Sequence, residues 1–369
     1  MTLSEILKQD KYSLPINRDN SVQIKVFIEK DILNAYLNDI RSSTDILDGI
    51  SPSKYSFTSI TYKNTIETII SDLLLIVDEY FSGKPANAFK LFDDFFTKTG
   101  YLNYFSTVTY PPNTSFYRIR KAHGSYPLNR KELFHIPFDK LERVTTQRFS
   151  IPGYPALYLG NSIYLCWEEL NRPNLFETQC MQFRNGIQLK VLDLDWTEYH
   201  MQLHLGGIDD NKLVDYGILW PLFALCYMIV PKANVDLPFK GEYIFPQLVM
   251  QFLQNQKGWP VYAIRYPSSK AKYDTKQSLN RYHNIVMPVK KINEKGYCPI
   301  LESYFSVSDV VPVSLKDIVK NSYTATGYKN SDIEKISLNF EDFFDYEETK
   351  FHELETYFQS IPFSKLTKL

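Results

Sequence analysis

One block of the sequence, residues 147–170, combines residue types that could do chemistry together. Arg148 precedes a rigid Pro-Gly turn, Tyr158 lies in the short apolar strand that follows, and Glu169 lies eleven residues further on, in a predicted helix. A guanidinium binds phosphate oxygens through paired hydrogen bonds. A carboxylate stabilises positive charge that develops during a reaction, and a flat tyrosine ring can stack on a planar group.

Two more polar residues lie far from this block, Arg118 in FYRI and Ser268 in the YPSS turn. Taken singly, each candidate has an ordinary structural explanation: a salt-bridged arginine, a solvated helix glutamate, a core tyrosine or a turn serine. Their joint occurrence is what indicates a site. Weaker pocket candidates are Arg120, His123 and Tyr154.

These spaced motifs resemble the RES domain, a family named for its Arg, Glu and Ser. In that family the block reads GRFNPPG, then ALYLA, then a Glu-Val or Glu-Leu step, and a YPS turn follows late in the domain. The resemblance covers residues 116–291, about half of the chain. Five family positions are matched in order, by Arg118, Arg148, Tyr158, Glu169 and Ser268.

The sequence departs from the family pattern at three points. Gln147 stands where the family usually has glycine, and Ser150 stands where it often has asparagine. Glu168 offers a second carboxylate beside Glu169. The geometry of the turn and the choice of glutamate are therefore open.

The resemblance implies a fold similar to that of ADP-ribosyltransferases and a reaction that consumes NAD+. Family members commonly act as toxins that deplete NAD+, often paired with an Xre-type antitoxin, and some are reported as protein ADP-ribosyltransferases. We therefore expect a cytoplasmic bacterial toxin that cleaves the nicotinamide–ribose bond as a glycohydrolase or phosphorylase, with NAD+ as substrate and no separate cofactor or metal. Two alternatives stay open: ADP-ribosyl transfer to a macromolecule, and a catalytically idle module that binds ADP-ribose or a nucleotide.

Breaking that bond develops oxocarbenium character on the ribose, so Glu169 is the candidate that stabilises this charge and holds ribose hydroxyls. Arg118 and Arg148 would bind the diphosphate. Tyr158 would stack on nicotinamide or line its pocket, and Ser268 would hydrogen-bond the nicotinamide amide or the ribose. The catalytic set is thus Glu169, Arg118, Tyr158 and Ser268, and the NAD+-binding set is Arg118, Arg148, Tyr158 and Ser268.

The first hundred residues have the three- and four-residue apolar spacing of helices. One helix is predicted around residues 28–40. A second opens at Asn64 with a capping-box pattern and ends at Gly83. A third begins at Pro85 and stops at Gly100. These residues predict a small helical N-terminal domain.

Beyond the Pro111-Pro112 pair, interpreted as a linker, short β-rich runs alternate with turn signals. Strands are predicted at 187–195, 261–266 and 285–289, and a buried helix or strand–helix junction at 243–253. The predicted class is α+β, with a compact sheet and helices laid on it.

The C-terminal region carries an apolar stripe from Phe340 to Phe358 with acidic residues on the other side. It predicts a helix that either docks on the body or binds a partner. The chain is therefore divided into a helical N-terminal domain (1–110), a RES, ADP-ribosyltransferase-like domain (111–298) and a helical C-terminal extension (299–369).

Composition restricts the function classes. Lys and Arg number 41 against 42 Asp and Glu, so the chain lacks the global basicity of a protein that binds nucleic acid through phosphates. Glycine-rich dinucleotide, P-loop and nucleophile-elbow motifs are missing from the sequence. The longest apolar stretch, 216–230, is shorter than the roughly 18 residues of a membrane span and reads as core.

The four cysteines are widely spaced, which favours reduced thiols over a disulfide scaffold or a zinc site. Cys166 is a conceivable nucleophile, but its acidic neighbours disfavour a thiolate. His200 and His204 have the spacing of two metal ligands on one helix face. Because no third ligand is evident, they are interpreted as structural histidines.

Overall fold

The computed structural model describes residues 1–122, 128–256, 258–268, 270, 282–313, 335–337 and 343–366. It consists of two compact units, each assembled from distant parts of the sequence. Unit 1 contains Met1–Ser106, Thr146–Ile151 and Trp196–Trp259, and unit 2 contains Thr107–Thr145, Pro152–Asp195 and Pro260–Leu369. Unit 1 is mainly helical and unit 2 holds a large sheet, which confirms the predicted α+β class.

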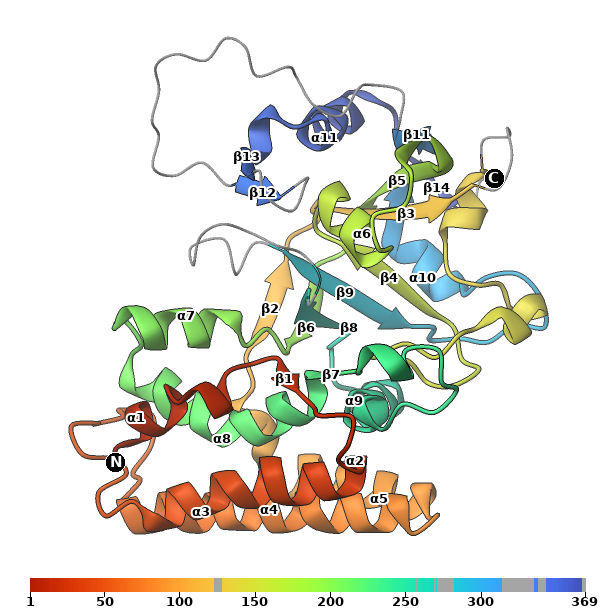
Figure 1. The fold of residues 1–369 in the computed structure, drawn as a ribbon. Coiled ribbons are helices and arrows are strands. Elements are labelled where there is room, and N and C mark those ends of the chain that lie inside the picture. The colour runs from red at the N-terminus through yellow and green to blue at the C-terminus, as the bar shows by residue number, and fades with distance from the viewer. Residues whose placement is uncertain are drawn as a thin grey trace, which may run out of the picture. The chain divides into compact units, whose positions relative to one another are not determined.

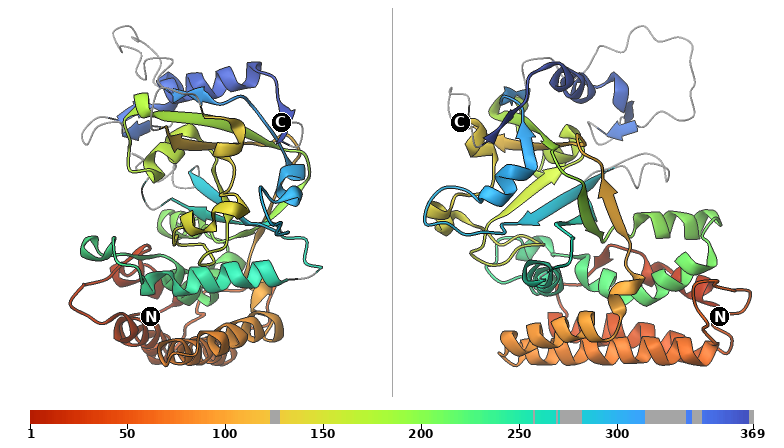
Figure 2. Two further views of the ribbon diagram at one scale, coloured as in Figure 1. Left: turned by 90° about the vertical axis from the view of Figure 1, so that its right-hand side faces the viewer. Right: turned by 180° about the vertical axis from the view of Figure 1, so that it is seen from behind.

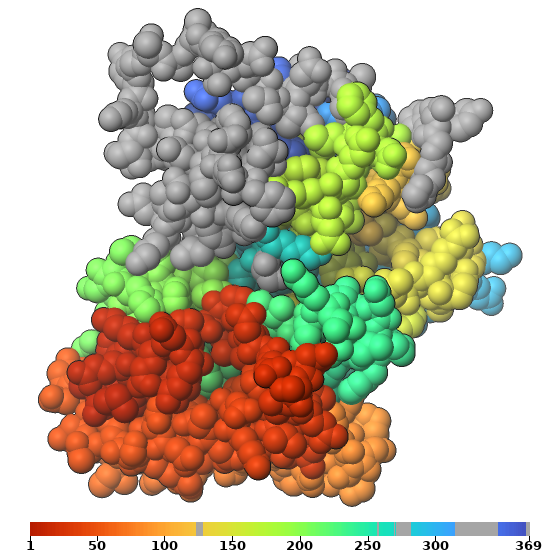
Figure 3. Space-filling model, in the orientation of Figure 1, coloured from red at the N-terminus to blue at the C-terminus, as the bar shows by residue number. Residues whose placement is uncertain are grey.

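The helices of unit 1 are α1 (Leu3–Leu7), α2 (Ile24–Val26), α3 (Ala35–Ser42), α4 (Ser59–Phe81), α5 (Pro85–Lys98), α7 (Thr197–Leu205), α8 (Asp210–Cys226) and α9 (Ile244–Asn255). A π-helical turn, Phe27–Asn34, joins α2 to α3. Strands β1 (Ile16–Asn17) and β7 (Met228–Ile229) pair in parallel. Helices α4 and α5 lie side by side (Figures 1 and 2), and residues near the N-terminus cover much of this unit in Figure 3.

Helix α4 begins earlier than predicted. Thr58 Oγ1 accepts from the Thr61 backbone N–H, and Thr61 Oγ1 accepts from the Thr58 backbone N–H, so this capping box lies six residues before Asn64. The reciprocal cap satisfies two N–H groups that the helix itself leaves unpaired. The predicted stops at Gly83 and Gly100 are confirmed, because both follow a helix and have positive φ values of 79° and 73°.

The apolar stretch 216–230 is core, as predicted. Most of it forms the buried half of α8, which tolerates Pro221 inside the helix. Trp220 Nε1 donates a 2.9 Å hydrogen bond to the carbonyl of Tyr12, and the two rings pack edge to face. The predicted segment 243–253 is likewise a buried helix, α9.

Ten strands of the described residues form the sheet of unit 2, in the order β14-β10-β5-β3-β4-β9-β8-β6-β2, with β11 paired to β5. The strands are β2 (Thr107–Tyr110), β3 (Ser115–Lys121), β4 (Ala156–Gly160), β5 (Thr178–Asn185), β6 (Leu189–Asp193), β8 (Ala263–Pro267), β9 (His283–Pro288), β10 (Phe305–Val307), β11 (Val311–Pro312) and β14 (Ser364–Lys365). Pairing is antiparallel except between β6 and β8. The predicted strands at 187–195, 261–266 and 285–289 correspond to β6, β8 and β9.

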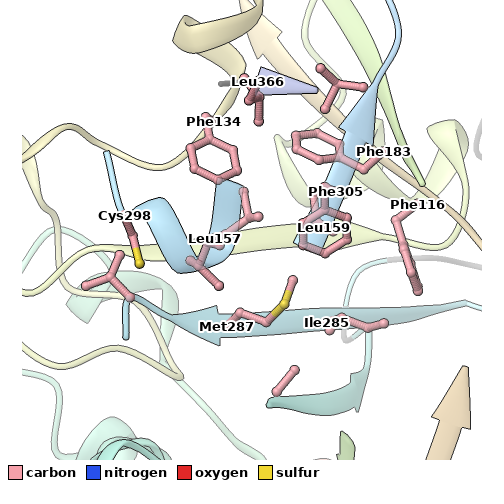
Figure 4. Packing of buried hydrophobic residues seen from close by; sticks show 14 of the residues in the cluster. Phe116, Phe134, Leu157, Leu159, Phe183, Ile285, Met287, Cys298, Phe305 and Leu366 are labelled. Carbon is pink, nitrogen blue, oxygen red and sulfur yellow. The ribbon is translucent and has the colours of Figure 1, made fainter. Parts of the chain in front are cut away.

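The other elements of unit 2 are α6 (Ile163–Glu169), α10 (Pro299–Tyr304), α11 (Lys350–Ser360) and the antiparallel pair β12 (Lys335–Ser337) and β13 (Phe343–Asp345). Leu157 and Leu159 of β4 enter a buried core with Ile285 and Met287 of β9 (Figure 4). Because side chains alternate along a strand, Tyr158 lies on the opposite face of β4 from these leucines.

Three element predictions differ from the structure. The Pro111-Pro112 pair forms the turn between β2 and β3 within unit 2, where the N–H of Asn113 donates to the carbonyl of Asn185. The C-terminal helix, α11, starts at Lys350, because Thr349 caps it. Phe340 lies outside the described residues. The predicted extension is more than helical, since β10, β11 and β14 join the sheet.

Candidate functional site

Helix α6 carries Glu169 as its last residue and packs against β4. Ser162 caps the helix by accepting a hydrogen bond from the backbone N–H of Leu165. Gly160, at the end of β4, has no room for a side chain, because a Cβ atom there would lie 2.7 Å from Cys166 Sγ. The close approach of helix and strand therefore fixes where Glu169 emerges.

The carboxylate of Glu169 is held by two donors. Ser268 Oγ donates to Glu169 Oε1 at 2.7 Å, and Asn284 Nδ2 donates to the same oxygen at 2.8 Å. Ser268 is 8% exposed and Asn284 is 6% exposed. Two of the predicted site residues, Glu169 and Ser268, are thus in direct contact although they lie 99 positions apart in the sequence.

Sequence reasoning missed Asn284. It sits just ahead of the predicted strand 285–289, where a single asparagine has no pattern that marks it. Only the pairing of β9 with β4, in which Asn284 lies opposite Gly160, brings its amide to Glu169.

The second carboxylate, Glu168, has a different environment. It is 4% exposed, and the Nε atom of Arg172 lies 3.0 Å from each of its oxygens. The hydrogen bond from Arg172 to Glu168 also raises the pKa of the guanidinium. Glu168 therefore acts as the ion-pair partner of Arg172, and Glu169 is the glutamate that meets Ser268.

Arg118 lies in β3, paired with Met181 of β5. Within the part of the chain that the structure describes, its guanidinium makes no hydrogen bond or ion pair, and its Nη1 atom is buried. Burial, and to a smaller extent the positive charge of Arg120, lowers the pKa of Arg118 to about 10. The group is still charged at neutral pH, so its charge is buried without an anionic partner.

Arg118 interacts electrostatically with Tyr158 and with Cys166. Burial raises the pKa of the Tyr158 hydroxyl, and the nearby Arg118 charge opposes this rise. Burial also raises the pKa of the Cys166 thiol to about 12, where Glu169 raises it and Arg118 lowers it. Arg118 and Glu169 therefore both lie near Cys166, whose high pKa makes a thiolate nucleophile unfavourable.

Arg148 belongs to unit 1, whereas the other four predicted site residues belong to unit 2. Its Nη1 donates to the carbonyls of Cys226 and Met228 at 2.8 and 2.9 Å, and its guanidinium lies over the ring of Tyr243. These bonds satisfy the carbonyl of the last residue of α8 and a carbonyl of β7. Binding of a phosphate by Arg148 stays a prediction.

The turn at residues 147–150, where the sequence departs from the family pattern, is held together by the side chain of Ser150. Ser150 Oγ accepts from the backbone N–H of Gln147 and donates to the carbonyl of Gln147, at 3.0 and 2.9 Å. Serine at this position therefore supports the backbone of residue 147 by itself.

The weaker candidates have structural contacts. Arg120 is exposed and donates to the carbonyl of Glu132, while the Tyr154 hydroxyl donates to the carbonyl of Val289. His123 lies outside the described residues. The rings of His200 and His204 pack together in α7, with centroids 4.2 Å apart.

The described residues contain no group of three or more His, Cys, Asp or Glu side chains arranged to hold a metal ion. No helix among them has the length and apolar character needed to span a membrane.

Comparison with known proteins found a similar protein of a bacterium. The chain is 28% identical over 337 residues to a protein of Bacillus subtilis (strain 168) described as "Putative toxin YopC", an alignment that covers 87% of this chain and 73% of the relative. No family model matches the chain, and no solved structure matches it.

Proposed function

We propose that this protein is a toxin that degrades NAD+ by cleaving its nicotinamide–ribose bond. The similarity to a Bacillus subtilis protein described as a toxin supports the first part of the proposal. The resemblance to RES domains and the residues of the site support the second part. If the enzyme consumes the NAD+ of its own cell, a neutralising antitoxin is required, and the resemblance suggests one of the Xre type.

The observation that carries the proposal is the guanidinium of Arg118, whose Nη1 atom is buried. Among the described residues it has no anionic partner, although burying a charge without one is costly. A diphosphate supplies the missing charge and fits the planar, forked donors of an arginine. NAD+ carries such a diphosphate between its two nucleosides.

The remaining residues suit the reacting end of NAD+. In the proposed reaction the bond from ribose C1′ to the nicotinamide nitrogen breaks, and its electron pair leaves with nicotinamide. The ionised carboxylate of Glu169 stabilises the oxocarbenium character on the ribose. Tyr158 offers a ring beside nicotinamide. Because Ser268 donates to Glu169 Oε1, we assign it the task of orienting this carboxylate.

Three acceptors complete the proposed reaction in different ways. Water adds its oxygen to C1′ and releases a proton, which gives ADP-ribose. Inorganic phosphate adds an oxygen to C1′ and gives the corresponding phosphate ester. A nucleophilic side chain of another protein, after losing its proton, carries the ADP-ribosyl group instead.

The test is nicotinamide release from NAD+ by the purified protein, with and without phosphate. Glu169→Gln is expected to lower the rate by at least about 100-fold, as loss of a preorganised electrostatic group does. The matched control is Glu177→Gln, because Glu177 is an exposed glutamate at a neighbouring turn. If the unaltered protein leaves NAD+ intact under all conditions, the proposal is wrong. Labelled NAD+ that becomes attached to a protein would instead identify a transferase.

A further inference from the structure

We infer that Asn284 is a positioning residue for Glu169, and that Oε2 of Glu169 is the oxygen that meets the substrate. The first half of this inference concerns the protein alone. The second half rests on the proposed function.

Asn284 is held rigidly on both sides. In β9 it lies opposite Gly160 of β4 and opposite Tyr266 of β8, so its backbone belongs to two strand pairs. Its side chain is almost completely buried. A buried amide needs hydrogen-bond partners, and its Nδ2 atom donates to Glu169 Oε1 at 2.8 Å. The amide is therefore a fixed donor.

The two oxygens of Glu169 have different surroundings. Oε1 accepts from both Asn284 and Ser268, which is about the number of hydrogen bonds that one carboxylate oxygen can accept. Oε2 accepts no hydrogen bond from any residue in the described ranges. Two donors on one oxygen fix the plane of the carboxylate and leave the other oxygen for a ligand.

Both donors to the carboxylate are neutral. Lys270 is close, but its Nζ donates to the backbone carbonyl of Glu169 at 2.7 Å, and the Cys166 thiol is a further titratable group near Glu169. Hydrogen bonds from neutral donors orient the carboxylate and place no positive charge beside it. The arrangement therefore keeps a full negative charge available for a developing oxocarbenium ion.

The experiment combines carboxyl titration with kinetics. The pKa of Glu169 is measured by NMR on protein labelled with carbon-13 at the glutamate carboxyls, assigned with Glu169→Gln. Asn284→Asp places a like charge beside Glu169 and is expected to raise this pKa by at least about 1 unit. Asn284→Ala removes only the donor and is expected to raise it less. Asn293→Asp is the matched control, because Asn293 is exposed and bonds to Tyr297.

In nicotinamide release, both Asn284 variants are expected to lower kcat roughly 10–100-fold, the fold-change expected when a hydrogen bond to a charged group is lost. The KM for NAD+ is expected to stay near that of the unaltered protein. The acid limb of the pH profile moves upward with the pKa of Glu169. A purely structural role of Asn284 would move neither the pH profile nor the carboxyl pKa.

The outcomes separate this inference from the proposed function. If the unaltered protein does not attack NAD+ but the Asn284 variants still raise the pKa of Glu169, the proposed function fails and the positioning role stands. If the protein is active but Asn284→Ala changes neither the pKa nor the pH profile, the inference is overturned. Should Asn284→Asp fail to fold, the carboxyl pKa and the pH profile of Asn284→Ala alone test the inference.

Discussion

The carboxylate of Glu355 in α11 accepts a 2.7 Å hydrogen bond from the backbone N–H of Ile163, the first residue of α6. The tyrosine hydroxyl of Tyr346 donates to the same carboxylate. The C-terminal helix is therefore coupled to the helix that carries Glu169. A negative charge at this position also interacts favourably with the helix dipole of α6.

Glu355→Ala is expected to reduce stability by about 1–2 kcal/mol, the usual effect of losing a cap or a charged hydrogen bond. Glu355→Gln keeps an acceptor for Ile163 and is expected to lose less. Urea unfolding of the three proteins measures the difference. Equal stability of all three would show that the contact with α6 contributes nothing.

Replacement of Arg118 is expected to have opposite effects on stability and on ligand binding. Arg118→Met removes a charge that has no anionic partner among the described residues. The free energy of unfolding of the protein without ligand is therefore expected to rise by about 1–3 kcal/mol. The same variant should lose measurable NAD+ binding, because the diphosphate loses its charged partner.

Denaturant unfolding and calorimetric titration with NAD+ test the two halves separately. Arg120→Met is the control, because Arg120 is an exposed arginine of the same strand. A loss of stability in Arg118→Met would mean that the guanidinium is already satisfied in the unliganded protein.

The close contact between β4 and α6 predicts a rescue. Gly160→Ala is expected to lower the free energy of unfolding by about 1–3 kcal/mol, because the new Cβ would lie only 2.7 Å from Cys166 Sγ. Adding Cys166→Ala removes that sulfur and is expected to restore part of the loss. Thermal unfolding of the unaltered protein, Gly160→Ala, Cys166→Ala and the double variant gives a double-mutant cycle. Strict additivity would contradict the steric explanation.

His135 predicts a pH dependence of stability. The imidazole is buried, its Nε2 accepts from the N–H of Cys298, and burial lowers its pKa to about 4. Because this pKa lies below the unfolded value of about 6.5, protonation favours the unfolded state. The neutral imidazole of His135 therefore contributes at most about 3 kcal/mol to the free energy of unfolding. This contribution is complete above about pH 6.5 and is lost as the pH falls through 4.

Urea unfolding between pH 4 and 8 measures this dependence. In His135→Gln the titrating group is gone, so the decline of stability on the acid side is expected to be shallower. Identical pH profiles for the two proteins would show that His135 does not titrate between the folded and unfolded states.

Local patterns in the sequence predict much of the fold. The helix stops at Gly83 and Gly100 and the strands that became β6, β8 and β9 follow from apolar spacing and turn residues, which depend on neighbouring residues alone. Helix α4 begins at Ser59 and not at Asn64, because the side chains and backbones of Thr58 and Thr61 form its capping box.

The sequence by itself determined the residue types of the site and the order in which they occur. Only the tertiary structure shows that Glu169, and not Glu168, contacts Ser268, because consecutive helix residues point in directions about 100° apart and either could face the sheet. The contact of Asn284 with Glu169, which depends on strand pairing, is likewise visible only in the tertiary structure. So are the hydrogen bonds from Arg148 to carbonyls of α8 and β7. These contacts join residues about 80 to 115 positions apart, and such distances are bridged by packing that no local pattern records.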